Sequence, residues 1–247
     1  MTAADALAYL TAHADPQKAI GMGRYFKTGP GEYGEGDSFL GLTVPQTRAA
    51  AKRFQALSLS ETEALLHSSH HEARLLALLI LVNQYQKGSP QTQEAIFTLY
   101  LRSTQYINNW DLIDGTAEYI VGAHLQHTGK QILIDLAHSP DLWRRRIAML
   151  SCFHDIKQGN AAPSFVIIDI LKNDSHDLIQ KAVGWMLREI GKRCSRAEIV
   201  AWLAQDSQYK ALPRTTLRYA IEHFTPEERQ LYLKGNVVSF HQSGGEI

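Results

Sequence analysis

A tryptophan and an aspartate stand four residues apart in the segment 108–114, which reads NNWDLID. On a helix such residues share a face, so the side chains of Trp110 and Asp114 are expected to meet. A carboxylate beside an indole ring could stabilise a nearby cation through its charge and through the ring face. Alternatively, Trp110 is a buried core residue and Asp114 a helix cap, and the segment taken alone favours this alternative.

Three consecutive arginines, Arg144, Arg145 and Arg146, follow Trp143. Together they cover most of a helix circumference, so at least one is expected to face the inner surface of a helical array. Arginine binds phosphate through two parallel hydrogen bonds, and anchoring the backbone is its commonest role at nucleic acid. The run is equally compatible with one arginine that packs between repeats and two that lie in solvent.

A third segment, residues 181–189, reads KAVGWMLRE. Trp185 lies four residues beyond Lys181, and the absence of a side chain at Gly184 would let another backbone approach closely. Taken alone, Trp185 is a core residue by default. Farther along, Arg214 and Arg218 are four residues apart on one helical face, a spacing that suits phosphate contacts.

Charged residues also recur along the chain at similar intervals. Gaps of 37, 34, 36 and 33 residues separate Arg74, Asp111, Arg145, Lys181 and Arg214, and an apolar helical segment follows each. A period in the mid-thirties is typical of solenoids built from helix pairs. We therefore predict an all-α repeat fold in which this position of every repeat lines one concave surface.

Several helix starts are marked by capping residues. Capping boxes are predicted at Ser60 with Glu63, Ser195 with Glu198, and Thr225 with Glu228. Further starts are indicated by Ser89-Pro90 and Ser139-Pro140. No segment alternates as a β-strand would, so about a dozen helices joined by short loops are predicted.

One repeat domain is expected over residues 1–234. Within it, residues 27–45 contain five Gly and two Pro, which predicts an irregular connector. This segment lacks the Lys-Ser/Thr ending of a phosphate-binding loop, so a structural loop is favoured over a nucleotide site. Residues 235–247 are expected to form a weakly ordered tail.

The charge is unevenly distributed although Lys/Arg and Asp/Glu number 25 each. Residues 143–218 contain 13 Lys/Arg and 7 Asp/Glu, a net charge of +6, whereas residues 1–142 carry −4. A basic central band is a plausible footprint for a polyanion, although chance asymmetry of helix surfaces would also produce one. No run is apolar enough to span a bilayer, and the N-terminus does not resemble a signal peptide.

Metal and thiol chemistry have weak support in the sequence. The close pairs among His67, His70, His71, His124 and His127 do not match the HExxH pattern, and no Cys or carboxylate group completes a ligand set. Cys152 and Cys194 are isolated, which favours a reducing cytoplasm. We expect neither a metal nor another cofactor.

Five segments together resemble the AlkD-like DNA alkylation repair proteins. They read YFKTGPGEYGEGDSFLG, NNWDLID, LWRRRIAML, KAVGWMLREIGK and LPRTTLRYAIEHF, and they span roughly residues 24–224. The resemblance implies a HEAT-like α-α superhelix that wraps duplex DNA on a basic concave face. It also implies a DNA glycosylase that releases cationic alkylpurines such as 3-methyladenine and 7-methylguanine.

The resemblance also assigns roles to individual residues. The family's catalytic aspartate falls on Asp114, its two site tryptophans on Trp110 and Trp185, and its phosphate-binding arginine near the lesion on Arg146. Tyr25 matches a family aromatic beside the DNA, although the glycine-rich stretch after it differs from the best-known members. Other phosphate contacts are expected from Arg145, Lys181, Arg188, Arg214 and Arg218.

The partner that this interpretation implies is alkylated duplex DNA. We expect a monomer in the cytoplasm that needs neither a membrane nor an obligate protein partner. Two alternatives stay open: a non-catalytic protein that binds bent or branched DNA, and a helical scaffold that binds a protein. The retained Trp110, Asp114 and Trp185 favour excision over the first, and the basic repeats favour DNA over the second.

Overall fold

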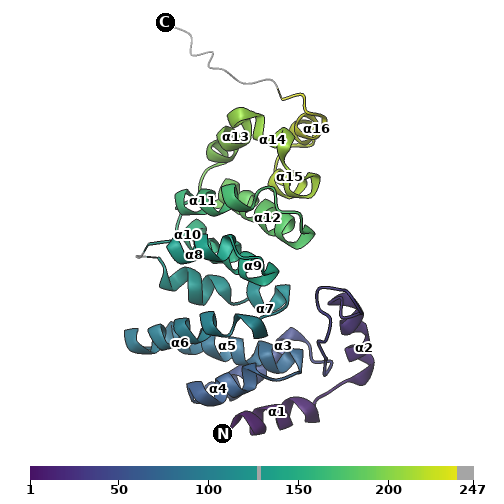
Figure 1. The fold of residues 1–247 in the computed structure, drawn as a ribbon, viewed down its shortest axis with the longest axis vertical. Helices are drawn as coiled ribbons and strands as arrows, with labels where there is room; N and C mark the ends of the chain where they lie inside the picture. Colours follow the sequence, from purple (N-terminus) through teal and green to yellow (C-terminus); the bar gives the residue numbers. More distant parts are fainter. Residues whose placement is uncertain (127–128, 238–247) are drawn as a thin grey trace, which may run out of the picture. The chain divides into compact units, whose positions relative to one another are not determined.

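The computed structural model describes residues 1–126 and 129–237, and within these residues the secondary structure is helical. The described residues make one β interaction, an isolated bridge between Ser38 and His70. The prediction of an all-α fold is confirmed. The contacts separate the chain into two compact units, one spanning Met1–Gly129 and one beginning at Lys130 (Figure 1). The single domain expected over residues 1–234 stays a prediction, and most of the expected tail lies outside the described residues.

The first unit is organised around one long helix, α5 (His71–Lys87). Its apolar run is buried, and it packs against α3, α4, α6 and α7. The helices of this unit are α1 (Ala3–Ala12), α2 (Pro16–Tyr25), α3 (Val44–Arg53), α4 (Leu59–Leu66), α5, α6 (Pro90–Arg102), η1 (Thr104–Tyr106), α7 (Trp110–Asp114) and the π-helical η2 (Glu118–Gly122).

The second unit is organised around α12 (Asp177–Arg193), which packs most extensively against α15 and also against α9 and α13 (Figure 1). The other helices are α8 (Gln131–Ala137), α9 (Leu142–Ser151), α10 (Phe153–Lys157), α11 (Ala162–Leu171), α13 (Arg196–Ala204), η3 (Gln205–Ser207), α14 (Gln208–Ala211), α15 (Arg214–Ala220) and α16 (Pro226–Lys234). In the described part of the chain, no helix has both the length and the apolar composition needed to cross a membrane.

The close packing of α12 on α15 depends on Gly184. A Cβ atom at this position would lie 2.5 Å from Cβ of Tyr219 and 2.6 Å from the carbonyl oxygen of Thr216. The hydroxyl of Thr216 donates a hydrogen bond to the carbonyl of Gln180, one turn earlier on α12. The prediction that Gly184 allows a close approach of another backbone is confirmed.

Substituting alanine for Gly184 is therefore expected to destabilise the protein, by about 1–3 kcal/mol, because α12 and α15 must move apart. Gly191→Ala on the same helix is the matched control. Its Cβ would lie 3.4 Å from Ile199, an ordinary contact, so the helix preference for alanine should make it neutral or stabilising. Urea unfolding of both variants measures the difference. Equal stability of the two variants would contradict the packing argument.

The repeated charged position has a structural role in both units. In α5, Arg74 donates to the carbonyl of Ser68, six residues earlier, and in α9, Arg145 donates to the carbonyl of Ser139, also six residues earlier. Each arginine thereby ties the preceding loop to the first turn of its helix. The prediction that this position lines an open surface is wrong for Arg74, which is only 4 % exposed.

Two predicted helix starts are also wrong. Helix α4 is capped by Ser58 and not by Ser60, and α9 is capped by Asp141, whose own amide donates to the hydroxyl of Ser139. An aspartate caps α9 because its carboxylate accepts from two backbone amides at once. The capping box at Thr225 and the cap at Ser89 are confirmed, and Ser195 caps α13 by accepting from the amide of Glu198.

Candidate functional site

The short helix α7 presents Trp110 and Asp114 at the surface of the first unit. Its middle residues, Leu112 and Ile113, are fully buried, so they fix the helix to the core while both site residues stay half-buried. The cap of α7 is Asn109, and Asp114 is its last residue. A π-helical turn, η2, follows closely, a distortion that is frequent at functional sites. The alternative of a fully buried Trp110 does not hold.

Aromatic rings flank Trp110 within the same unit. The ring of Phe26 stacks on it at a centroid distance of 5.3 Å, and the ring of Tyr25 meets it edge-on at 5.9 Å. Phe26 is buried, whereas Tyr25 is 66 % exposed. The buried ring fixes the plane of the indole, and the exposed phenol extends the aromatic surface toward solvent. The structure thus places Tyr25 against Trp110, and it places Asp114 on the same short helix as Trp110, so all three predicted site residues lie in this unit.

The charge of Asp114 also acts on the core behind α7. Burial raises the pKa of the Tyr100 hydroxyl, its hydrogen bond with Thr116 lowers that pKa, and the charge of Asp114 raises it. The hydroxyl of Thr116 in turn donates to the carbonyl of Leu112 in α7. Asp114 therefore lies at the edge of a low-dielectric region, where a carboxylate interacts strongly with a developing positive charge.

In the second unit, Trp185 is held by a buried carboxylate. Its indole nitrogen donates to Oε1 of Glu189, at 3.3 Å, and its ring lies 5.7 Å from that of Phe153. Burial raises the pKa of Glu189, but hydrogen bonds from Arg193 and Arg188 outweigh it and hold the pKa below its usual value. Glu189 therefore stays ionised near neutral pH, and it orients a half-buried indole.

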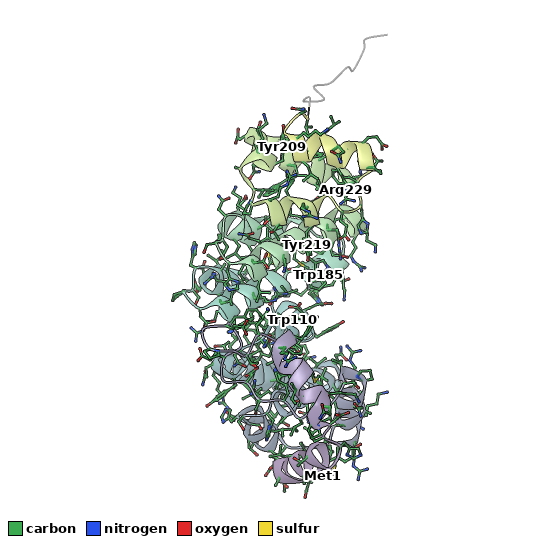
Figure 2. The ribbon with its side chains drawn as sticks, turned by 90° about the vertical axis from the view of Figure 1, so that its right-hand side faces the viewer. Met1, Trp110, Trp185, Tyr209, Tyr219 and Arg229 are labelled. Carbon is green, nitrogen blue, oxygen red and sulfur yellow. The ribbon has the colours of Figure 1, made fainter. Side chains whose placement is uncertain are left out.

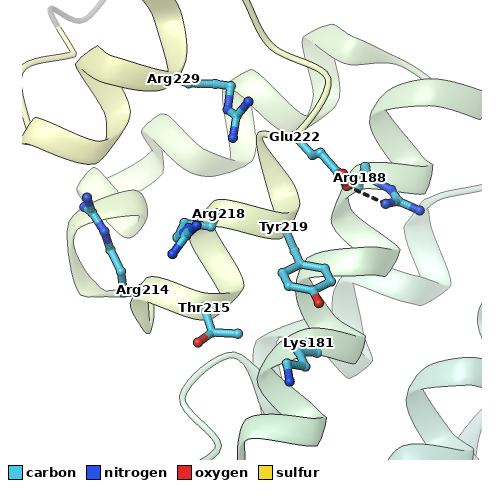
Figure 3. A pocket seen from close by; sticks show the side chains of 8 residues that line it. All are labelled: Lys181, Arg188, Arg214, Thr215, Arg218, Tyr219, Glu222 and Arg229. Atoms are coloured by element: carbon cyan, nitrogen blue, oxygen red, sulfur yellow. Dashed lines mark hydrogen bonds and ion pairs between the residues drawn. The ribbon is translucent and has the colours of Figure 1, made fainter. Parts of the chain in front are cut away.

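A basic pocket of about 500 Å³ lies beside α12, the helix of Trp185, in the same unit (Figure 3). Figure 2 labels Trp185 together with two of the lining residues, Tyr219 and Arg229. Residues from α12, α15, the turn after α15, and α16 line it. They are Lys181, Arg188, Arg214, Thr215, Arg218, Tyr219, Glu222 and Arg229. Five cationic side chains thus face one carboxylate, and that carboxylate is bonded to Arg188 (Figure 3). Such a pocket suits an anion with several oxygen atoms, such as a phosphodiester.

Comparison with known proteins decides the family. The model of a family described as DNA alkylation repair enzyme matches residues 6–224. The chain belongs to this family. One solved structure, a predicted DNA alkylation repair enzyme from Enterococcus faecalis, is 19 % identical and aligns with a TM-score of 0.62 over 86 % of this chain and 97 % of that chain. This likeness confirms the helical-repeat fold, and the comparison with curated proteins finds no match.

The other arginines and lysines expected to bind DNA in this alkylation repair protein already make contacts within the protein, and these contacts differ from one residue to the next. Arg146 is buried and donates to the carbonyl of Leu178, and Arg145 forms an ion pair with Asp174 at 2.7 Å. Lys181 pairs with Asp177 at 2.6 Å, and Arg214 donates to the carbonyl of Leu233. Their roles as phosphate ligands stay predictions, as does a basic concave face.

Trp185 and these basic residues belong to the second unit, whereas Trp110, Asp114 and Tyr25 belong to the first. Three residues were not predicted from the sequence as parts of the site: Tyr219 and Arg229 in the pocket, and Glu189 beside Trp185. The four-residue spacing from Trp185 to Glu189 could have revealed Glu189.

Among the described residues, no group of His, Cys, Asp and Glu could hold a metal ion, and His127 lies outside those residues.

Proposed function

We propose that the protein is a DNA glycosylase that hydrolyses the N-glycosidic bond of cationic alkylated purines, such as 3-methyladenine and 7-methylguanine, in duplex DNA. Of the four tryptophans, Trp143 and Trp202 are buried, and Trp110 and Trp185 are the two that stay half-exposed. The observation that carries the proposal is that α7 presents the indole ring of Trp110 and the carboxylate of Asp114 together, both half-buried. A solvent-facing indole beside a carboxylate suits a cationic reaction centre better than it suits packing.

The proposed reaction needs no protonation of the leaving group. As the bond between the sugar C1′ and the purine nitrogen breaks, its electron pair neutralises the charge of the base, and the sugar becomes oxocarbenium-like. Asp114 stabilises that positive charge and orients a water molecule, whose oxygen bonds to C1′ while its proton passes to the carboxylate or to solvent. The ring face of Trp110 contributes about 1–2 kcal/mol of cation–π stabilisation in a desolvated site.

The resemblance to the family assigns Trp185 as the second ring that faces the deoxyribose and Arg146 as a phosphate ligand. We propose that Trp185 and Arg146 have these roles within the second unit, and that the basic pocket of the same unit contacts the DNA backbone. Contacts made mainly to the backbone leave the damaged base unenclosed, unlike in enzymes that flip the base into a tight pocket. Substrates are then restricted to bases whose bonds are already labile.

Base release from a duplex that carries one 7-methylguanine tests the proposal. Free base is expected to appear at a rate well above spontaneous depurination, with an abasic site left in the strand. No release above the spontaneous rate, with binding to the same duplex intact, would contradict the glycosylase and support the non-catalytic DNA-binding alternative. Absence of both release and binding would contradict a DNA function altogether.

Arg218→Ala is expected to weaken duplex binding at all sequences and to reduce the slope of log affinity against log salt by about 1, because one phosphate contact is lost. Arg218 is exposed on α15 and lines the basic pocket. Lys87→Ala is the control, since Lys87 is the single cation of a pocket formed by polar and glycine residues. An unchanged slope for Arg218→Ala, measured by fluorescence anisotropy, would remove this residue from the interface.

A further inference from the structure

A buried histidine connects α7 to two other parts of the first unit. His71 opens α5 and is 1 % exposed. Its Nδ1 lies 3.0 Å from Oδ2 of Asp37, in the glycine-rich loop, and its Nε2 lies 2.9 Å from Oδ2 of Asp111, in α7. One imidazole thus joins three segments that are 34 and 40 residues apart in the chain.

The geometry indicates which form of the imidazole is present. A neutral imidazole has one N–H, and its other nitrogen is an acceptor, whereas ionised carboxylates can only accept. Both nitrogens of His71 face a carboxylate oxygen, so both contacts are satisfied only when the ring is an imidazolium. Burial lowers the pKa of His71, but hydrogen bonds with Asp111 and Asp37 and their negative charges outweigh burial and raise the pKa to about 8.

The surrounding charges balance this imidazolium. Arg74 forms an ion pair with Oδ1 of Asp37 at 2.5 Å, so two cations meet two carboxylates. Among the described residues, Oδ1 of Asp111 is buried and receives no hydrogen bond, which leaves Asp111 dependent on His71. The positive end of the α5 dipole disfavours a charged His71, but it acts through partial charges and both carboxylates are in direct contact.

The other described neighbours of His71 are aromatic rings or polar groups that already make hydrogen bonds, including His70, whose Nδ1 lies 3.1 Å from the hydroxyl of Ser38. The ring of Phe39 stacks on the imidazole at 4.5 Å, and the ring of Phe26 lies tilted against it at 5.0 Å. The adjacent carboxylate of Glu72 accepts backbone hydrogen bonds from residues 40–42. Asn108 donates to Asp37 at 3.2 Å.

We propose that His71 is a positioning residue that fixes α7, and with it Trp110 and Asp114, against α5 and the glycine-rich loop. The inference rests on the proposed function for its effect on catalysis. Helix α7 has five residues and is too short to be stable alone, so its direction depends on such anchors. Phe26 also connects the two groups, because its ring contacts both His71 and Trp110. Loss of the charge leaves His71 with one N–H for two carboxylates. Asp37 keeps Arg74 and Asn108 as donors, whereas Asp111 loses its hydrogen bond when the remaining proton is on Nδ1, and α7 then becomes free to shift.

The wild-type protein tests this positioning without any substrate. In a pH titration followed by NMR, the imidazole of His71 is expected to titrate near pH 8, and the indole N–H signal of Trp110 is expected to move with the same midpoint. Trp110→Phe assigns that signal. Titration of His71 at an ordinary histidine pKa would overturn the proposal. So would a Trp110 indole N–H signal whose chemical shift does not change as His71 titrates.

Variants then test the effect on catalysis. His71→Asn places an amide nitrogen near Nδ1 and loses the bond to Asp111, whereas His71→Gln reaches farther and places one near Nε2. We expect kcat for base release to fall about tenfold in wild type as pH rises through 8. His71→Asn should be about tenfold slower than wild type at pH 7, and His71→Gln should recover part of the rate and lose the fall at pH 8. His138→Gln, at an exposed histidine of the second unit, should keep the wild-type profile.

The outcomes separate this proposal from the proposed function. Wild-type protein that releases no base contradicts the glycosylase, while the NMR titration still decides whether His71 fixes α7. A His71→Asn variant with wild-type kcat and an unchanged pH profile would overturn the positioning role even if the enzyme is a glycosylase. Circular dichroism and duplex affinity show whether each variant is folded.

Discussion

Asp114→Asn is expected to reduce the rate of base release from a 7-methylguanine duplex by roughly 100-fold to 1000-fold, the effect of removing one preorganised electrostatic contact from a transition state. The substitution nearly preserves shape, but it removes the negative charge that the oxocarbenium-like sugar requires. Because Asp114 is half-buried, solvent does not fully screen this charge. Single-turnover release at saturating enzyme measures the chemical step directly.

The control for this experiment is Asp135→Asn, which removes one exposed carboxylate from α8. Both variants lose one negative charge, so any general increase in DNA affinity should be similar in the two. Release by Asp135→Asn should match wild type, and the melting temperature of both variants should change little. Retention of wild-type release by Asp114→Asn would exclude Asp114 as the catalytic carboxylate.

Local patterns in the sequence predict much of this fold. The apolar period and the caps at Ser89 and Thr225 depend on residues within a few positions of one another, and the structure confirms them. The sequence predicts the start of α4 two residues too late, because Ser58 and Ser60 each precede a glutamate by three residues, at Glu61 and Glu63. Two equivalent local signals cannot be ranked without knowing which face of the helix is buried.

The candidate site is less visible in the sequence because its supports join distant segments. Trp110 and Asp114 were singled out from their spacing, and the structure places them on one helix. The contacts of His71 and Arg74 with Asp37, in contrast, connect a loop to a helix more than 30 residues later. Nothing in the spacing of these residues predicts the contacts, and the glycine-rich segment was interpreted only as a connector. Its glycines allow the turns, while its single aspartate binds the loop to α5.

Asp37→Ala is therefore expected to be among the most destabilising single substitutions in the first unit, by about 3–5 kcal/mol. It leaves the cations of His71 and Arg74 buried side by side without their shared carboxylate. Glu35→Ala, at an exposed residue of the same loop, is the control and should cost less than about 1 kcal/mol. Urea unfolding measures both. In the double variant Asp37→Ala/Arg74→Met the loss should be smaller than the sum of the single losses, because one unpaired cation is removed.

The pH dependence of this loss follows from the direction of each pKa shift. Burial raises the pKa of Asp37, but the hydrogen bond from His71 and the charge of Arg74 outweigh it and hold the pKa below the ordinary 3.8. Asp37 therefore contributes its stability above pH 3.8 and loses it as pH falls through the lower native pKa. The pKa of His71 is raised from 6.5 to about 8, so its contribution is complete below pH 6.5 and is lost as pH rises through 8.

The difference in unfolding free energy between wild type and Asp37→Ala should thus be largest between pH 3.8 and 6.5. It should be smaller above pH 8, where His71 is neutral and only Arg74 still needs the carboxylate as a partner. A difference that is constant from pH 5 to pH 9 would show that Asp37 does not stabilise a charged His71.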